Sequence, residues 1–330
     1  MLVIGESLID LVHSPDGSTQ EHVGGSPANV AVGLARLSHD VVFATMIGHD
    51  ERGTRIASLL GEEGVRLTQD SVGERRTSVA TSTLDASGAA TYDFDLVWEL
   101  SELQSLEGIT HVHTGSIAAT LEPGASAVLS TLQSARAHAT ISYDPNVRPS
   151  LMGDPREVRA KIEQLIGLSD VVKASDEDIA WLYDEEPLLD VLKLWGQLGP
   201  ALVVMTRGGN GALVRLSITG EITSIDAPVV DVVDTVGAGD SFMAGLLSGL
   251  VQAGYLGGMQ ARERLRSASL ADVGPSVNRA LACAAITVSR AGANPPHLAE
   301  ITIGEWKQQT VLVLPPNVIT AASSHSEDST

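Results

Sequence analysis

Two carboxylates, Asp234 and Asp240, flank a turn of small residues that leads into an apolar stretch. Gly237, Ala238 and Gly239 form this turn, and their small size leaves consecutive backbone N–H groups open to a ligand. Such N–H groups at the start of a helix stabilise negative charge. An ionised Asp240 beside them could accept the proton of a hydroxyl. A proton acceptor next to an anion site is the chemistry expected of a kinase.

The same turn has a plainer interpretation. Asp240 could simply begin a helix, and Asp234 could flank that helix or form an ion pair.

Two other phosphate-binding patterns do not fit the sequence. No G-x-x-x-x-G-K-[ST] segment is present, and "GAGDSF" lacks the third glycine of G-x-G-x-x-G and lies far from the first predicted βα unit. These absences disfavour a P-loop enzyme and an NAD-linked dehydrogenase.

A second glycine-containing segment lies near the N-terminus, where Gly24 and Gly25 precede a predicted helix. Glycines let a ligand approach the backbone, and the amide of Asn29 can both donate to and accept from hydroxyl groups. We expect Ser26 to cap this helix and Pro27 to occupy its first position. Without further information Asn29 could equally be a surface residue.

Composition limits the classes of partner. The 330 residues are 43% hydrophobic, which is enough for a substantial core, and 41 acidic against 21 basic residues give a net charge of −20. This charge argues against a nucleic-acid partner. The single cysteine, Cys283, rules out an intrachain disulfide and fits a reducing compartment. The first residues have no basic region and no long apolar run, so we expect a cytoplasmic protein without a signal peptide or membrane helix.

Strand-like and helix-like stretches alternate along most of the chain. Runs such as "LVIG", "ATISYDP" and "ALVVMTRGG" have the character of buried strands, and "REVRAKIEQLIGL" has helical periodicity. This alternation predicts an α/β fold with a mainly parallel sheet and helices on both faces. Ligands should then bind beyond the carboxyl ends of the strands.

Two segments depart from this alternation. Residues of about 6–23 and 76–98 alternate in the manner of half-exposed antiparallel strands, with "DASG" as a hairpin turn. They predict a small sheet that projects from the main domain as a lid, through which two chains could form a homodimer. We expect one domain over residues 1–312 and a tail over 313–330 whose polar end is disordered.

The two glycine segments together resemble a known family. "DTVGAGDSFMAGLL" and "GGSPANVAVGLARL" are similar to the two signature segments of the PfkB carbohydrate kinases, and the similarity extends from "VIGESLIDL" to "ITVSRAGANPP". This resemblance implies a ribokinase-like three-layer fold with a small β-sheet lid. It also implies an ATP-dependent sugar kinase that needs Mg²⁺ and is activated by K⁺.

The resemblance gives roles to the residues of the late segment. Asp240 corresponds to the base that takes the proton of the sugar hydroxyl, and the N–H groups of residues 237–240 correspond to the anion hole. Asp234 corresponds to the carboxylate ligand of K⁺, and Gly292 falls in the cation loop of related kinases.

For the sugar, the resemblance implies that Asp10 and Asn29 bind hydroxyl groups. Asn146 and Arg148 are similar to a D-x-N-x-R element of fructokinases and ketodeoxygluconate kinases. Arg148 could bind a phosphate or a sugar carboxylate, or could form an ordinary ion pair. The expected substrate-binding residues are Asp10, Gly24, Gly25, Asn29, Asn146 and Arg148.

For the nucleotide, "TRGGNG" resembles the family's T-x-G-x-x-G element. The usual N-x-x-E segment is replaced by "SDED", in which Asp178 stands for the glutamate that organises Mg²⁺. A shorter carboxylate can still order metal-bound water. The expected nucleotide-binding residues are Ser175, Thr206, Gly208, Gly211 and Asn278, and the expected metal-site residues are Asp234, Asp178 and Gly292.

The expected substrate is fructose, since "GESLIDL", "DPNVRP" and "SDED" resemble the fructokinase branch. A 2-keto-3-deoxygluconate or other sugar-acid kinase is the alternative, in which Arg148, Arg75 and Arg76 would bind the carboxylate. A ribokinase or adenosine kinase fits less well. The intact glycine turn and Asp240 argue against a non-catalytic relative that only senses a sugar or nucleotide.

Overall fold

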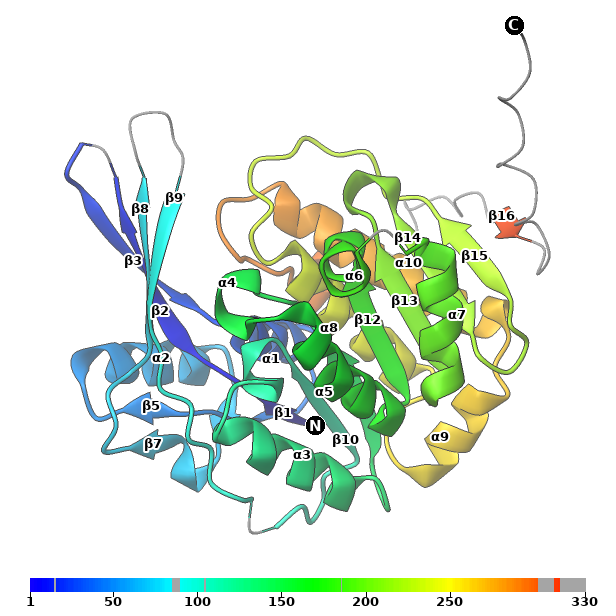
Figure 1. The fold of residues 1–330 in the computed structure, drawn as a ribbon, viewed down its shortest axis with the longest axis horizontal. Helices are drawn as coiled ribbons and strands as arrows, with labels where there is room; N and C mark the ends of the chain where they lie inside the picture. Colours follow the sequence, from blue (N-terminus) through cyan, green and yellow to red (C-terminus); the bar gives the residue numbers. More distant parts are fainter. Residues whose placement is uncertain (15, 85–89, 104, 185, 302–311, 315–330) are drawn as a thin grey trace, which may run out of the picture.

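The central sheet is built from short apolar strands (Figure 1). The computed structural model describes residues 1–14, 16–84, 90–103, 105–184, 186–301 and 312–314. Across the ten-stranded sheet the order is β16 (Leu312–Leu314), β15 (Ile222–Ile225), β14 (Ala212–Leu216), β13 (Leu202–Thr206), β12 (Val171–Ser175), β11 (Thr140–Asp144), β10 (His111–Gly115), β1 (Leu2–Ile4), β4 (Val42–Ala44) and β6 (Arg66–Leu67). The strands from β6 to β13 are parallel, and β14 to β16 pair antiparallel.

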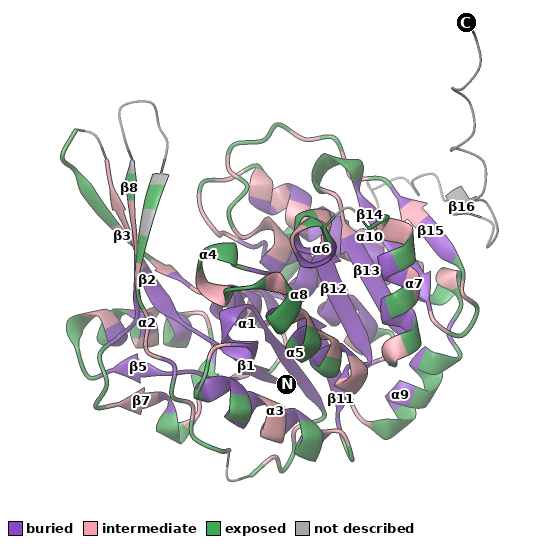
Figure 2. Cartoon of the chain, in the orientation of Figure 1, coloured by how far each residue is buried: buried purple, intermediate pink, exposed green. Residues whose placement is uncertain are grey.

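Helices cover both faces of this sheet, as the alternation in the sequence predicts. Successive strand residues point to opposite faces, so that Val171 and Val172 belong to different hydrophobic clusters. The cluster around Val171 includes side chains from α1 (Ser26–Arg36), α2 (Glu51–Glu62), α8 (Ala238–Gln252), α9 (Met259–Arg266) and α10 (Leu270–Val288). The cluster around Val172 includes side chains from α3 (Gly124–Ala135), α5 (Pro155–Leu168), α6 (Asp176–Tyr183) and α7 (Leu188–Leu198). The structure therefore has three layers (Figure 2).

The lid is a separate four-stranded sheet in the order β3 (Thr19–Gly24), β2 (Leu8–His13), β8 (Val79–Leu84) and β9 (Ala90–Asp95). The two hairpins are antiparallel as expected, but β2 and β8 in the middle are parallel. This differs from the expected all-antiparallel sheet because both strands run outward from the main domain (Figure 1). The predicted "DASG" turn lies outside the described residues.

Three further elements are short. The strands β5 (Ile47–Gly48) and β7 (Val72–Gly73) pair with each other, and α4 (Pro149–Met152) is a single turn. The boundary predicted at residue 312 lies inside β16, which pairs with β15. The predicted disorder of the chain's end concerns 315–330, outside the described residues. Among the helices that the structure describes, none is long and apolar enough to cross a membrane.

Small residues place α8 close to its neighbours. A Cβ atom on Gly245 would lie 2.8 Å from both the Cα atom of Ala280 and the Sγ atom of Cys283 in α10. Real Cβ atoms do not approach other atoms so closely, so only glycine lets the two helices pack at this distance. The first turn of α8 carries Asp240, and the packing with α10 therefore helps to fix the position of that carboxylate.

Gly245→Ala should lower the free energy of unfolding by about 1 to 3 kcal/mol, because the backbone of α10 must move to admit the methyl group. The matched control is Gly61→Ala in α2, where nothing lies within 4 Å of the added Cβ atom. The control should be stabilised by up to about 1 kcal/mol, since alanine is the better helix former. Urea unfolding measures both, and equal stabilities for the two variants would contradict the packing argument.

Candidate active site

A cavity of about 870 Å³ lies between the lid sheet and the carboxyl ends of the central strands. It is where the parallel topology predicts a ligand site. Polar residues at or just after five strand ends line it: Glu6 after β1, Ser116 after β10, Asn146 after β11, Ser175 at the end of β12 and Thr206 at the end of β13.

The lid contributes one row of side chains to the cavity. Asp10 in β2 is paired with Ala80 in β8, and Ala80 is paired with Phe94 in β9. Paired residues point to the same face of a sheet, and all three of these line the cavity. His22 in β3 is the neighbour of Asp10 on its other side. The wall of the cavity on the lid side is therefore a continuous cross-strand row.

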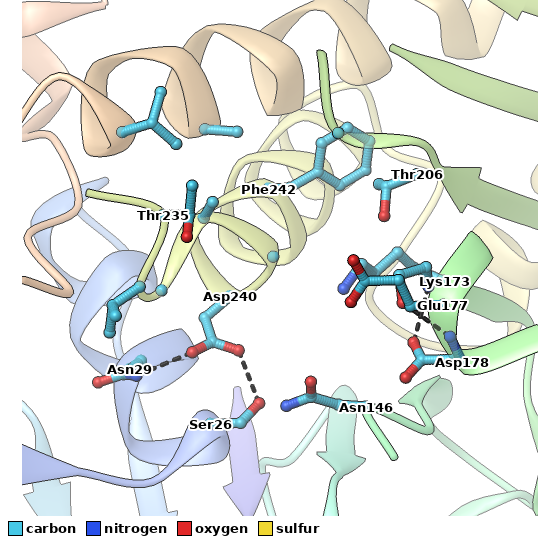
Figure 3. Close-up of a pocket in the computed structure, with 18 of the residues that line it drawn as sticks. Ser26, Asn29, Asn146, Lys173, Glu177, Asp178, Thr206, Thr235, Asp240 and Phe242 are labelled. Carbon is cyan, nitrogen blue, oxygen red and sulfur yellow. Dashed lines mark hydrogen bonds between the residues drawn. The ribbon is translucent and has the colours of Figure 1, made fainter. Parts of the chain in front are cut away.

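Asp240 is buried in the first turn of α8 and is held from α1 (Figure 3). The hydroxyl of Ser26 donates to Oδ1 at 2.7 Å, and Nδ2 of Asn29 donates to Oδ2 at 2.8 Å. Ser26 was expected to cap α1, but the N-cap position belongs to Gly25, without a side-chain capping bond. The hydroxyl reaches Asp240 instead, because Ser26 is the first residue inside the helix and faces α8.

On the lid side of the cavity, Asp10 lies against the backbone of Gly24. A Cβ atom on Gly24 would be 1.9 Å from Oδ2 of Asp10, so the absence of a side chain there makes room for the carboxylate. Gly25 lines the cavity, whereas Gly24 does not line it and only makes room for the carboxylate of Asp10. Burial raises the pKa of Asp10, an effect that His22 and Arg148 partly offset. Among the described residues, no hydrogen bond engages the Asp10 carboxylate, which leaves it available to a ligand.

Glu6 is a cavity residue that the sequence analysis missed. Its Oε2 accepts a hydrogen bond from the N–H of Ala118 at 3.2 Å, and the side chain is buried. Burial raises its pKa to about 7. The available signal was an acidic residue directly after the apolar strand "LVIG", where a side chain faces the ligand edge of the sheet.

Asn146 and Arg148 lie together at the same edge. The guanidinium of Arg148 donates to the carbonyl oxygens of Asn146 and Val147 and to Oδ1 of Asn146. The ordinary ion pair considered for Arg148 is not found within the described part of the chain. Nδ2 of Asn146 is buried without a partner there, and its side chain lines the cavity (Figure 3). This amide can therefore donate to a ligand.

A buried ion pair that the sequence analysis also missed lies beside the cavity, which only its lysine lines. Nζ of Lys173 in β12 is 2.8 Å from Oδ2 of Asp144 in β11, and both side chains are almost fully buried. Although burial by itself lowers the pKa of Lys173, the carboxylates of Asp144, Asp178 and Asp240 raise it overall. Burial raises the pKa of Asp144 to about 6, with Lys173 opposing the shift. The pair is therefore charged at neutral pH.

The glycine turn forms the start of α8, whose first residue is Ala238. Gly237 is the N-cap residue with φ of 74°, in the left-handed region. Nearby, the carboxylate of Asp234 accepts from the N–H groups of Gly292 at 2.8 Å and of Val236 at 3.0 Å. These bonds hold the pKa of Asp234 below its usual range. The two residues expected at a K⁺ site are thus in direct contact.

The expected nucleotide residues mostly face the cavity. Ser175, Thr206, Gly208 and Gly211 line it, but Asn278 does not. The cavity also has apolar lining residues that the sequence analysis missed, namely Val229, Val230, Val232, Val236, Leu281, Ala284, Ala285 and Val288. Asn278 lies one helical turn before Leu281, and α10 has left the cavity at that point.

Residues 1–300 match the family model described as "pfkB family carbohydrate kinase". The chain belongs to this family. It is 31% identical over 300 residues to the fructokinase of Klebsiella pneumoniae, covering 88% of this chain and 94% of that protein. The solved structure of ATP-bound fructokinase from Xylella fastidiosa is similar with a TM-score of 0.78 and 26% identity, over 91% of this chain and 96% of that one.

A second solved structure adds a sugar and an ion. It is a double mutant of the fructokinase from Vibrio cholerae O395 with fructose, ADP and potassium bound, at a TM-score of 0.71 and 27% identity. The match covers 88% of this chain and 93% of that one. The ribokinase-like fold class predicted from the sequence is confirmed by these neighbours.

In this carbohydrate kinase, the expected Mg²⁺ residue Asp178 is held by the backbone. Its Oδ2 accepts from the N–H of Ser175 at 2.7 Å and its Oδ1 from the N–H of Val147 at 2.8 Å. Asp178 therefore fixes the start of α6, and Glu177 beside it is exposed on the cavity wall. No group of three or more metal-binding side chains occurs in the described ranges.

Glu6 should make the stability of this kinase pH-dependent. Its pKa of about 7 in the folded chain is above the ordinary value of 4.5, so the folded state holds the proton more tightly and loses stability as pH rises between these values. Glu6→Gln removes this dependence. The difference in unfolding free energy, wild type minus variant, should fall by about 3 kcal/mol between pH 4.5 and 8. Urea unfolding at several pH values measures it, and a pH-independent difference would contradict it.

Proposed function

We propose that the protein is an ATP-dependent fructokinase. The observation that carries the proposal is the place of Asp240, which stands between the sugar-side residues of α1 and the first N–H groups of α8. One carboxylate then faces both an acceptor hydroxyl and a phosphate. The fructokinase relatives, and the fructose and nucleotides in the titles of the solved neighbours, support the substrate and the donor.

The proposed reaction follows from this geometry. The sugar hydroxyl gives its proton to Asp240 while its oxygen bonds to the γ-phosphorus of ATP, and the bond from that phosphorus to the β,γ-bridging oxygen breaks to release ADP. Ser26 and Asn29 hold the two carboxylate oxygens in place. The backbone N–H groups of Gly237, Gly239 and Asp240 stabilise the negative charge on the transferring group, which is the main requirement of phosphoryl transfer. The N–H group of Ala238 already donates to the carbonyl oxygen of Thr235 at 3.2 Å.

The expected cofactors fit the residues present. Thr206, Gly208 and Gly211 would hold the nucleotide, and Mg²⁺ bound to its phosphates would neutralise their charge, with Glu177 and Asp178 as the nearby carboxylates. We also propose K⁺ at Asp234, which is supported by the contact with Gly292. A homodimer through the lid remains a prediction, for which β3 and β9 are the edge strands of that sheet within the described chain.

A neutral ketose fits the sugar-side charges better than a sugar acid does. Two acidic residues, the buried Glu6 and the partly buried Asp10, face this end of the cavity, and Arg148 is close enough to lower the pKa of both. Arg75 and Arg76, the other expected carboxylate partners, pair with Glu99 and Asp95 and do not line the cavity. Arg148 alone keeps 2-keto-3-deoxygluconate as the second candidate substrate.

Asp240→Asn should lower kcat by about 10² to 10⁴, since the amide cannot take the hydroxyl proton. The matched control is Asp272→Asn, because Asp272 holds the same third position in α10 but lies in an exposed capping box. The control should lose some stability and keep its kcat. Initial rates of ADP formation at saturating sugar and MgATP measure both. If both variants lost activity equally, Asp240 would act only as a helix-start residue.

Fructose should be phosphorylated with a higher kcat/KM than 2-keto-3-deoxygluconate, because an ionised Asp10 repels the carboxylate of the sugar acid. Rates on the two sugars are compared at excess MgATP, and Arg148→Met is measured alongside. The variant should lower kcat/KM for the sugar acid more than for fructose. A preference of the wild type for the sugar acid would overturn the fructokinase assignment and leave the kinase family membership intact.

A further inference from the structure

The ammonium group of Lys173 lies at the anion site itself. A Cβ atom built on Gly239, the second residue of α8, would be 3.0 Å from Nζ of Lys173. Lys173 comes from β12, and its side chain lines the same cavity as the first turn of α8 (Figure 3). A positive charge therefore stands next to the N–H groups that face the transferring phosphate.

The ammonium has donors to spare. Asp144 accepts one hydrogen bond from Nζ at 2.8 Å, and no other hydrogen bond engages this nitrogen in the described chain. An ammonium carries three N–H donors, so two are available to a ligand. Oδ1 of Asp144 is also buried without a partner. Asp144 thus fixes the end of the lysine side chain without saturating it.

A buried lysine is costly unless its charge is used. Removing an ammonium from water costs several kcal/mol, which a single carboxylate in a buried pair often only balances. Apolar residues would serve the core as well, as Val171 and Ala174 do on the same strand. The cost is understandable if an anionic ligand occupies the cavity during the reaction.

We propose that Lys173 donates a hydrogen bond to the γ-phosphoryl group as it passes to the sugar, and that Asp144 positions the ammonium for this contact. The inference rests on the proposed phosphoryl transfer at Asp240 and adds a side-chain cation to the backbone donors of α8. Both kinds of donor would act on the charge that spreads over the phosphoryl oxygens in the transition state.

A structural role for the pair makes different predictions. If Lys173 only neutralised Asp144, removing both charges would restore a working enzyme. If Lys173 contacts the γ-phosphoryl group, it should affect ligands that carry that group and spare ADP. The two roles are therefore separated by a double variant and by a comparison of nucleotides.

The variants are Lys173→Met, the double variant Lys173→Met with Asp144→Asn, and Lys173→Arg. We expect Lys173→Met and the double variant to lower kcat by about 10² to 10³, and Lys173→Arg to retain part of it. Calorimetric affinity for a non-hydrolysable ATP analogue should fall by about 10- to 100-fold in both methionine variants, because a charged hydrogen bond is lost. Affinity for ADP should not change.

The control is Arg262→Met. Nε of Arg262 lies 2.7 Å from Oδ1 of Asp170, and both side chains are almost fully buried, like those of Lys173 and Asp144. Asp170 directly precedes β12, so this pair lies at the end of the strands opposite the cavity. This control should lose stability and keep its kcat and its nucleotide affinities. Recovery of wild-type kcat by the double variant, or an equal loss of ADP and analogue affinity in Lys173→Met, would overturn the proposal.

The nucleotide comparison uses no sugar. A wild type that phosphorylates no tested sugar would count against the proposed function, while discrimination between the analogue and ADP through Lys173 would still be measurable.

Discussion

The site depends on the two hydrogen bonds that Asp240 accepts from Ser26 and Asn29. These residues lie 214 and 211 positions apart from Asp240 in the chain, so the bonds join the first long helix to the last third of the protein. A buried carboxylate is tolerated only where donors surround it. The donors come from the start of α1, and Gly33 allows α1 to lie close to α8, since a Cβ atom on Gly33 would be 2.7 Å from the Cβ atom of Ala244. The packing of the helices therefore also fixes the orientation of the carboxylate that accepts the proton.

The second feature is a polar stripe on one face of the parallel sheet. Ser142 in β11 contacts His111 at 3.0 Å and His113 at 2.9 Å in β10, and the Lys173–Asp144 pair lies further along toward the cavity. Burial lowers the pKa of His113 to about 3, so its ring is neutral and hydrogen bonding alone satisfies it. These polar side chains interrupt the hydrophobic layer on this face, and they form hydrogen bonds with one another. The stripe ends at the ammonium group of Lys173, at the edge of the sheet that faces the cavity.

The sequence was most informative where function depends on the local backbone. The turn at residues 237–240 and the alternation of strands and helices each lie within one continuous stretch, so the spacing of residues predicts them. Contacts between residues that are far apart in the sequence could not be predicted in this way. Lys173 meets Asp144 only because β11 and β12 are neighbours, and Ser26 leaves its expected cap because Asp240 lies opposite. The sequence likewise did not reveal that the carboxylate of Asp178 accepts hydrogen bonds from two backbone N–H groups. One of these groups belongs to Val147, which lies in the loop after β11, far from Asp178 in the sequence. Pattern and spacing carry no information about such pairs.

The lid wall has a consequence for how this architecture can change its substrate. Asp10, Ala80 and Phe94 each come from a different strand, and the backbone ladder holds them in one row. Their strands belong to a sheet that shares no ladder with the central one. A substitution in the row reshapes the sugar side without disturbing the strands that carry Lys173 and Asp144. Recognition and chemistry are thereby separable, so that selection can retune one while the other stays constant.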